Sequence, residues 1–508
     1  MKTARRSRRR LPIALLVLLA ACSDSTLSDA PPFAPTEPIA RRDLSGCSVE
    51  TTRGCVTVND GAPAETRYTL FNVQTAEGEG LYLIDGLGEV MRYWATSGLD
   101  GEPLPEPGTV ITTIERPGPT SFVRLIQFRA PCIALLDGEG AARWPHPAPP
   151  GARCGAGLDP IPYGFDRNGD PSADAHHDLH LWGAPVYPTP EITETLGDGR
   201  ILYLSHAELS QEQAEAVAGE GAEGLGDEPL VEIAADARTV LWEWLAADHF
   251  DELGFDEDAR AAIAAFTRGE AVGGLPLPPD QGFLLSNSAS YLGPNRHCPD
   301  PESTSCDHRF HPDNILVGSR QAALLFIVAR HAHPSRDWPE GTIVWRLGPD
   351  FTDTPHGPIS GQHHVHMIPA GLPGEGNILL FDNGSAAGFG RAEDGSPTAA
   401  LYNRGYSRVL EIDPVTGQTV WSYEQPVEGT DGTPRFYAFN LSSAQRLPDG
   451  NTFIAEGNSG RLFEVTPVGT IVWEFVSPFP PLITIPLPVG ALAVNVYRGY
   501  RVPPEWVR

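Results

Sequence analysis

Apolar and polar residues alternate in short runs along most of the chain, and these runs come in pairs joined by turn residues. Near the C-terminal end, SRVLEIDPVTGQTVWSYE (407–424) and GRLFEVTPVGTIVWEFVSP (460–478) each contain two such runs, a Gly-containing turn and a closing Trp. This alternation predicts two β-strands joined in a hairpin. A further strand-pair pattern precedes each hairpin, at 376–385 and 444–458. Two hairpins per unit predict a blade of four strands.

The same template recurs toward the N-terminus. Further closing hairpins or strands lie at 80–94, 132–144, 230–244 and 341–348. We therefore predict an all-β fold, a six-bladed β-propeller of four-stranded blades with loop and helical insertions, because alternation with aromatic strand ends favours a propeller over a β-sandwich. Insertions at 211–228 and 250–281 are expected as loops, and DARAAIAAFTR (258–268) is expected to form an inserted helix.

A Trp lies at or near the end of each closing strand. Periodic aromatic residues usually belong to the core, so we expect these side chains to pack between blades rather than to take part in chemistry. They are Trp94, Trp144, Trp242, Trp345, Trp421 and Trp473.

The N-terminal region has the layout of an export signal. Basic residues at 2–10 precede an apolar run at 11–21 that is too short to span a bilayer, and Leu19-Ala20-Ala21-Cys22 resembles a lipobox. We expect residues 1–21 to be a lipoprotein signal peptide, 22–45 a disordered tether and 46–508 the catalytic propeller. The protein would then be periplasmic or on the cell surface, held in the outer membrane only through lipidated Cys22. An ordinary cleaved signal without lipidation is the alternative.

The rest of the chain is strongly acidic. Its formal charge falls from −29 to −35 when the six basic residues of the signal are removed. Such a body repels nucleic acid, and an anionic substrate would need a local cationic pocket. No cofactor and no metal ligand set is indicated, and the oligomeric state is not encoded in any pattern. Individual Arg and His positions therefore become informative.

Six cysteines follow Cys22, and they fall as neighbours along the chain. An even number in an exported protein predicts disulfides, although six cysteines allow fifteen pairings. Proximity favours Cys47–Cys55, Cys132–Cys154 and Cys298–Cys306.

Polar residues at equivalent blade positions are the candidates for chemistry, because a propeller brings one loop of each blade to a shared axial mouth. His176, His177 and Asp178 open the third blade, and Gln362, His363 and His364 open the fifth. In the fourth blade, Asn287 lies at the start and Arg320 follows the strand NILVGS.

Several of these segments, in this order, resemble the bacterial arylsulfotransferase family. The similar segments cover most of the chain after the signal and are TLFNVQTAEGEGLYLIDGLGEVMRYW (69–94), NSASYL (287–292), NILVGSR (314–320), IVWRLG (343–348), GQHH (361–364), NILLFDNG (377–384) and VYRGYRVPPEW (496–506). Single elements are common in propellers. Their order, and the position of GQH before LLFDNG, carry the resemblance.

The resemblance implies an enzyme that moves a sulfuryl group from an aryl sulfate to a phenolic acceptor without a nucleotide donor. His363 would carry the group as a sulfohistidine, which predicts ping-pong kinetics. Arg320 would bind the sulfuryl oxygens, and Asn287 would donate an amide N–H to them. His177 would bind an oxygen or protonate the leaving phenolate.

The chain departs from the family at one position. The family's HxNS element has a histidine two residues before the asparagine, whereas Leu285 stands there in this chain. His297 or His311 could fill this role, the alignment could be shifted, or the transfer activity could be lost or altered. A non-catalytic propeller that binds a ligand or protein at the cell surface is therefore the alternative function, and a quinone-cofactor dehydrogenase is a weaker third.

Each site residue also has a purely structural interpretation. A histidine at a blade start can tie loop carbonyls together, Arg320 can pair with an acidic neighbour, Asn287 can be a turn residue, and His364 is a rival nucleophile. The acidic segment 166–174 resembles the first part of a calcium loop, but an acidic turn fits its spacing better.

Overall fold

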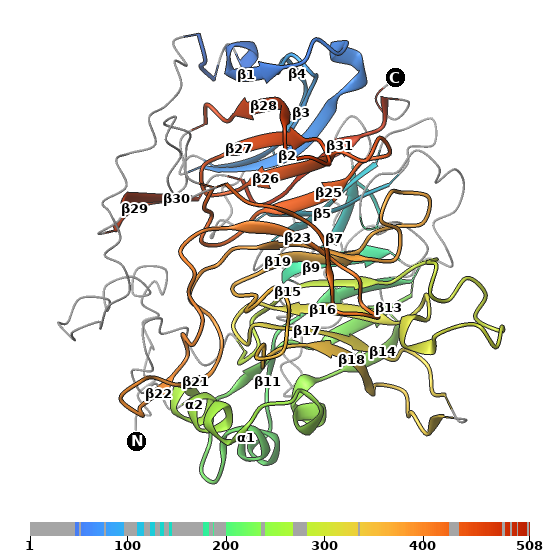
Figure 1. Ribbon diagram of the computed structural model, residues 1–508, viewed down its shortest axis with the longest axis vertical. Helices are drawn as coiled ribbons and strands as arrows, with labels where there is room; N and C mark the ends of the chain where they lie inside the picture. Colours follow the sequence, from blue (N-terminus) through green and yellow to red (C-terminus); the bar gives the residue numbers. More distant parts are fainter. Residues whose placement is uncertain are drawn as a thin grey trace, which may run out of the picture.

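The computed structural model describes one β-rich body (Figure 1). The described residues are 46–49, 52–75, 78–95, 109–115, 122–127, 133–136, 142–144, 176–181, 186, 200–234, 239–267, 282–333, 336–425, 436–479, 483–487, 490–494, 496–504 and 507. The predicted signal peptide, tether and acidic segment 166–174 lie outside these ranges, as do Cys132 and Cys154.

Short strands form sheets in which neighbours in the sequence pair antiparallel. Sheet 1 contains β31 (Gly499–Val502), β2 (Tyr68–Thr75), β3 (Gly78–Ile84) and β4 (Val90–Ala95), and sheet 2 contains β5 (Thr109–Glu115), β6 (Phe122–Gln127), β7 (Ile133–Leu136) and β8 (Ala142–Trp144). Sheet 3 contains β9 (His176–Leu181), β10 (Ile201–Leu204), β13 (Leu230–Ile233) and β14 (Val240–Trp244). Sheet 4 contains β15 (Ser286–Tyr291), β16 (Ile315–Ser319), β17 (Leu324–Val328) and β18 (Ile343–Leu347). Sheet 5 contains β19 (His363–Met367), β20 (Ile378–Asp382), β23 (Arg408–Ile412) and β24 (Thr419–Tyr423).

Sheet 6 differs from the others because it has five strands. It contains β25 (Ser443–Arg446), β26 (Thr452–Glu456), β27 (Arg461–Val465), β28 (Ile471–Val476) and β1 (Val56–Asn59). The described part of the chain therefore has five four-stranded blades rather than the six predicted. The β-propeller arrangement itself is confirmed, and the extra strand is the N-terminal β1, which pairs antiparallel with β28.

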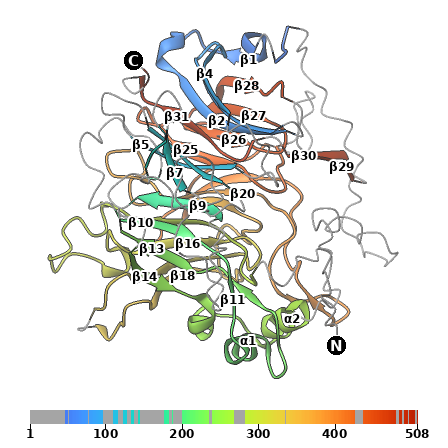
Figure 2. The same ribbon diagram turned by 180° about the vertical axis from the view of Figure 1, so that it is seen from behind.

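The first strands of the sheets contact one another in sequence around a ring. β2 contacts β5, and the contacts then run from β5 through β9, β15, β19 and β25 to β31, which pairs with β2. The C-terminal strand thus joins the first sheet and the N-terminal strand joins the last. Figure 2, seen from behind, shows β5 and β7 of sheet 2 between β31 of sheet 1 and β9 of sheet 3.

Four tryptophans link one sheet to the next through the same hydrogen bond. The indole N–H donates, at 2.8 Å, to a backbone carbonyl near the hairpin turn of the next sheet; the pairs are Trp244–Gly341, Trp345–Pro414, Trp421–Pro467 and Trp473–Gly86. The prediction of packing between blades is confirmed for Trp345, Trp421 and Trp473. In sheet 3, Trp244 makes this bond, whereas Trp242 packs against Arg330 of sheet 4. The side chains of Trp94 and Trp144 lie outside the description.

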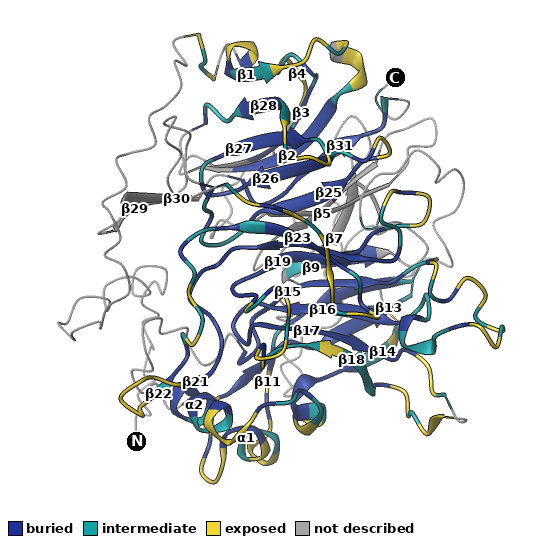
Figure 3. Ribbon diagram, viewed as in Figure 1, coloured by how far each residue is buried: buried dark blue, intermediate teal, exposed yellow. Residues whose placement is uncertain are grey.

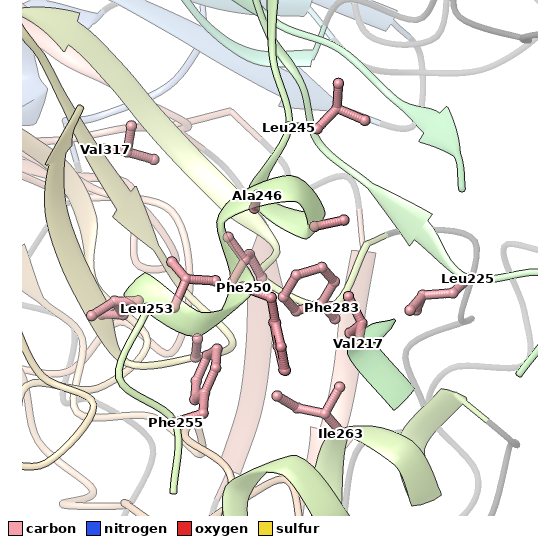
Figure 4. Packing of buried hydrophobic residues seen from close by; sticks show 14 of the residues in the cluster. Val217, Leu225, Leu245, Ala246, Phe250, Leu253, Phe255, Ile263, Phe283 and Val317 are labelled. Carbon is pink, nitrogen blue, oxygen red and sulfur yellow. The ribbon is translucent and has the colours of Figure 1, made fainter. Parts of the chain in front are cut away.

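Two helices cover the end of the molecule opposite to β1 and β4 (Figure 1). The predicted helix is present as α2 (Glu257–Thr267). The segment expected as a loop contains α1 (Gln211–Ala218), whose N-terminus is fixed by a capping box between Ser210 and Gln213. Both helices pack on the 3₁₀-helix η4 (Ala246–Glu252), and Figure 4 shows Phe250, Phe283, Ile263 and Val217 meeting between these elements.

The remaining elements are short. They are the strand pairs β11 (Ala207–Glu208) with β12 (Gly226–Asp227), β21 (Gly390–Arg391) with β22 (Pro397–Thr398) and β29 (Ile483–Leu487) with β30 (Gly490–Val494), and the 3₁₀-helices η2 (Thr52–Cys55), η3 (Ala64–Thr66) and η6 (His308–Phe310). The central strands are buried, and exposed residues concentrate in the connections (Figure 3).

Two of the predicted disulfides are present, Cys47–Cys55 and Cys298–Cys306. Within the described ranges, no helix combines the length and the apolar composition needed to cross a bilayer.

Candidate active site

The predicted site residues occupy one repeated position on the first strands of their sheets. His177 lies three residues before His180, Asn287 three before Ser290, and His363 three before His366. These later residues pair with Leu202, Leu316 and Leu379, each the second residue of the next strand. By the same register, Ser442 takes this position in sheet 6 and Arg498 takes it in sheet 1. The ring thus gathers these side chains around its centre.

The backbone at this position is irregular in sheets 3, 4 and 5. The register shifts beside His177, Asn287 and His364, so the first strand of each of these three sheets carries a bulge here. Residues in the left-handed region accompany the bulges: His177 (φ 55°), Leu285 (φ 46°) and His364 (φ 53°). Such conformations are costly for residues other than Gly, and they cluster at functional sites.

His363 has a defined tautomer. Its Nδ1 lies 2.8 Å from Asn383 Oδ1 and 2.9 Å from the Gly361 carbonyl oxygen. The Asn383 amide nitrogen donates to the carbonyls of Ala438 and Leu441, which fixes its oxygen toward the imidazole. Two acceptors require a proton on Nδ1. The Nε2 lone pair is therefore available, and it accepts the Leu441 backbone N–H at 3.2 Å.

The His363 imidazole is neutral at physiological pH. The side chain is only 4% exposed. Burial lowers the pKa of His363 to about 3, and the positive charges of Arg320 and Arg498 act in the same direction, although the Asn383 hydrogen bond opposes them. A neutral imidazole with an unprotonated Nε2 has the protonation state of a nucleophile.

Arg320 is a buried cation for which the described residues provide no carboxylate partner. Its side chain is 6% exposed, and its guanidinium contacts the Ser385 hydroxyl at 3.5 Å. Desolvation lowers the pKa of Arg320 to about 10. The other buried arginines of the described chain, Arg330, Arg446, Arg461, Arg498 and Arg501, all form ion pairs with carboxylates. An uncompensated buried guanidinium is a binding group for an anion.

Gly361 explains how the GQH segment reaches Arg320. Its φ is +66°, and a Cβ on this residue would lie 2.0 Å from Ser385 Oγ. Only Gly fits both the left-handed backbone and this close approach. The Gly361 carbonyl contacts His363 while Ser385 contacts Arg320, so this contact joins the imidazole to the cation.

An ion pair across the ring supports the remaining predicted residues. Arg498 of sheet 1 donates to Asp178 of sheet 3 at 2.8 Å and to the Asn287 carbonyl of sheet 4 at 3.0 Å. Asp178 also accepts the Ala289 N–H at 3.0 Å. This network holds His177, the neighbour of Asp178, and Asn287 in place.

His177 and Asn287 both lie beside His363. Burial lowers the pKa of His177 well below its usual value, and nearby His206, His363, Arg498 and Arg320 lower it further. The Asn287 amide nitrogen donates to the Gln362 carbonyl at 2.7 Å, and its side-chain oxygen is buried without a hydrogen bond in the described structure. All four predicted site residues are therefore brought together.

The alternatives for the missing histidine lie elsewhere. His297 packs against Phe310 and contacts the Gly376 carbonyl, and His311 contacts Asp313 and His331. These contacts lie at the starts of β20 and β16, the ends of these strands opposite to Asn383 and Arg320. Leu285 occupies the position itself, and its carbonyl accepts the Arg320 backbone N–H.

The rival nucleophile His364 points toward another sheet. Its Nδ1 lies 3.0 Å from the Ala444 carbonyl, and its ring packs against His366 and Tyr500. Within the described structure its Nε2 is buried and has no hydrogen-bond partner. His364 is thus enclosed by protein groups, whereas His363 lies near Arg320.

Sequence reasoning missed Asn383 and Arg498 as members of the site. Both stand in segments that carry the family resemblance, NILLFDNG and VYRGYR, but their contacts join residues 20 and 320 positions apart.

In the described ranges, no group of three or more His, Cys, Asp or Glu side chains is arranged to hold a metal ion.

Comparison with solved structures finds only distant similarities. A protein of unknown function from Bacteroides caccae has 10% identity and a TM-score of 0.40, and the match covers 86% of this chain and 99% of that one. The virginiamycin B lyase from Staphylococcus aureus has 9% identity and a TM-score of 0.32, covering 87% and 98%. These similarities are too low to support an argument about fold or function.

Comparison with curated proteins finds no match to the sequence. A family model described as "Arylsulfotransferase (ASST)" matches residues 192–477, which contain Asn287, Arg320 and His363. Because this match spans more than half of the chain, the protein belongs to the arylsulfotransferase family.

Proposed function

We propose that the protein transfers a sulfuryl group from an aryl sulfate to a phenolic acceptor, with His363 as the intermediate carrier. The observation that carries this proposal is the pairing of a neutral imidazole with an uncompensated buried guanidinium, His363 with Arg320. A non-catalytic scaffold gains nothing from burying a cation without a counter-ion. A sulfate monoester supplies that counter-ion.

In the first half-reaction, Nε2 of His363 attacks sulfur and the bond from sulfur to the aryl oxygen breaks. The Leu441 N–H now hydrogen-bonded to Nε2 must give way, because the same lone pair forms the N–S bond. Asn383 keeps the proton on Nδ1 and so keeps Nε2 reactive throughout the approach. In the second half-reaction a phenol oxygen attacks sulfur and the N–S bond breaks.

The surrounding groups stabilise the sulfuryl oxygens. Arg320 presents a planar set of donors that matches two oxygens of the group. Asn287 offers the amide N–H that it does not donate to Gln362, and His177, held neutral by burial and neighbouring positive charge, binds a further oxygen.

The proposal also covers the number of blades and the cellular location. We count sheet 6, with its added β1, as a sixth blade, because its first strand β25 contacts β19 of sheet 5 and β31 of sheet 1. We also propose export as a lipoprotein anchored through Cys22, on the basis of residues 1–22.

The test is transfer from 4-nitrophenyl sulfate to phenol. We expect nitrophenol release that increases with phenol concentration and initial rates that follow a ping-pong pattern. Brief incubation with the donor alone should leave acid-labile sulfur on the peptide containing His363. A matched His364→Gln variant should retain that label, and His363→Gln should lose it.

A negative result separates the alternatives. If no aryl sulfate releases a phenol, but aryl sulfates bind and raise the melting temperature, the protein is a binding propeller. If His364 carries the label, the assignment of the carrier is wrong.

A further inference from the structure

A second repeated position contributes to the site, at the end of the second strand of each sheet. The segments ILYLSH (201–206), ILVGSR (315–320) and ILLFDN (378–383) align without gaps. The register agrees, because Leu204 pairs with Leu230, Gly318 with Leu325 and Phe381 with Val409, and each target residue follows two positions later. The three equivalent residues are His206, Arg320 and Asn383.

Two of these three residues already belong to the proposed site. Arg320 is the uncompensated cation, and Asn383 orients His363. The third, His206, lies in sheet 3, next to sheet 4 in the ring. It also lies near the site, because it is the largest charged contributor, after burial, to the lowered pKa of His177. His206 is partly exposed rather than buried.

The proposed reaction needs a group that exchanges a proton with phenols. Arg320 and Asn287 do not exchange protons at neutral pH. His177 is partly exposed, as His206 is, but burial of its ring and positive neighbours disfavour its charged form. Burial also raises the pKa of the nearby Tyr500 phenol to about 12. Leu285 cannot exchange a proton either, although it stands where the family has a histidine.

We propose that His206 is the acid–base catalyst of the phenol half-reactions, at a position different from the family's missing histidine. This inference rests on the proposed function. As the S–O bond of the donor breaks, His206 gives its proton to the aryl oxygen and becomes neutral. It then takes the proton of the acceptor phenol as that oxygen attacks sulfur and the bond to His363 breaks.

The test uses two donors that differ in their need for an acid. Nitrophenolate is a weak base and leaves unaided, whereas phenolate resembles the tyrosine side chain, with a pKa of about 10. In His206→Gln, kcat/KM should fall less than about 3-fold for 4-nitrophenyl sulfate and roughly 100-fold or more for phenyl sulfate. The matched control is His331→Gln, a surface histidine paired with Asp313, which should change neither value.

The outcomes are distinguishable. An equal loss for both donors in His206→Gln and in a second variant, His206→Asn, would assign a structural role and overturn the inference, as would no loss for phenyl sulfate. A wild-type protein that releases no phenol from either donor would instead overturn the proposed function. Retained labelling of His363 by 4-nitrophenyl sulfate in His206→Gln would support both.

Discussion

Buried arginines in this protein fall into two groups that use the same side chain differently. Between sheets they meet built-in carboxylates, as in Arg446 with Glu411 at 2.7 Å and Arg501 with Glu464 at 2.9 Å. Among the described residues, the Arg320 guanidinium has one hydrogen-bond partner, the Ser385 hydroxyl at 3.5 Å. The first group is neutralised by the fold, and the second is left for a ligand to neutralise.

The contrast is informative because acidic side chains are abundant. The sequence has 65 Asp and Glu residues against 36 Lys and Arg, yet none of the described carboxylates lies within ion-pair distance of Arg320. Leaving a guanidinium desolvated lowers stability, and such costs are typical of functional sites. Removing a member of each group should therefore have opposite consequences for stability and activity.

The largest effect is expected at the nucleophile beside Arg320. His363→Ala removes the atom that bonds to sulfur, so transfer should fall by about a thousand-fold or more. The measurement is the initial rate of nitrophenol release with saturating phenol. Near-wild-type transfer in folded His363→Ala would refute the mechanism.

Substituting one arginine of each group by Met compares their effects on activity and on stability. Arg320→Met should lower kcat/KM roughly 100- to 1,000-fold, because the transition-state charge loses its main donor. Its free energy of unfolding should stay the same or rise, since a desolvated charge is removed. Activity assays and urea unfolding on the same sample provide both values.

The matched substitution between sheets should do the reverse. Arg446→Met leaves Glu411 buried without its cation and should cost about 3–5 kcal/mol of stability. The folded fraction should keep its kcat. If Arg320→Met were the more destabilising of the two variants, Arg320 would be a structural residue like the others.

Much of the fold could be predicted from the sequence, and the features that could not have physical reasons. Alternation and closing Trp residues located the strands, and the GQH and NILVGSR segments located His363 and Arg320. The extra strand β1 was not foreseen because VTVN (56–59) is too short to show the blade pattern. The helix α1 was expected as a loop because its eight residues carry little apolar periodicity.

Ion pairs across the ring could not be predicted from the sequence either. Arg320 and Arg498 both lie in segments that resemble the family, but only the assembled sheets 1 and 3 show that Asp178 neutralises Arg498. Nothing in the local sequence distinguishes a paired arginine from an unpaired one. Sites that depend on an absent partner need the assembled structure.

The buried imidazoles of the site predict how stability changes with pH. Burial lowers the pKa of His363 and of His366 to about 3, so the folded state stays unprotonated where the unfolded chain, with a pKa near 6.5, takes up protons. Unfolding is therefore favoured as pH falls below about 6.5. Each such histidine should contribute a slope of about 1.4 kcal/mol per pH unit between pH 6 and 5.

His366→Gln tests this point without touching Arg320 or the nucleophile. The variant should reduce the slope of unfolding free energy against pH by about one proton in that window. Between pH 7.5 and 8.5 the two proteins should show parallel stability curves. An unchanged slope in the acid window would mean that His366 is protonated in the folded protein.

The smallest expected effect concerns the uncharged links between sheets. Trp421→Phe keeps most of the ring but removes the N–H donated to the Pro467 carbonyl at 2.8 Å, so stability should fall by about 1 kcal/mol. Because Trp421 also lies under the Arg446 guanidinium, the same substitution at Trp345, whose indole donates to Pro414, is the matched control. Urea unfolding should show similar losses for both, with transfer activity unchanged. A markedly larger loss at Trp421 would show that its contact with Arg446 strengthens the neutralised group of arginines.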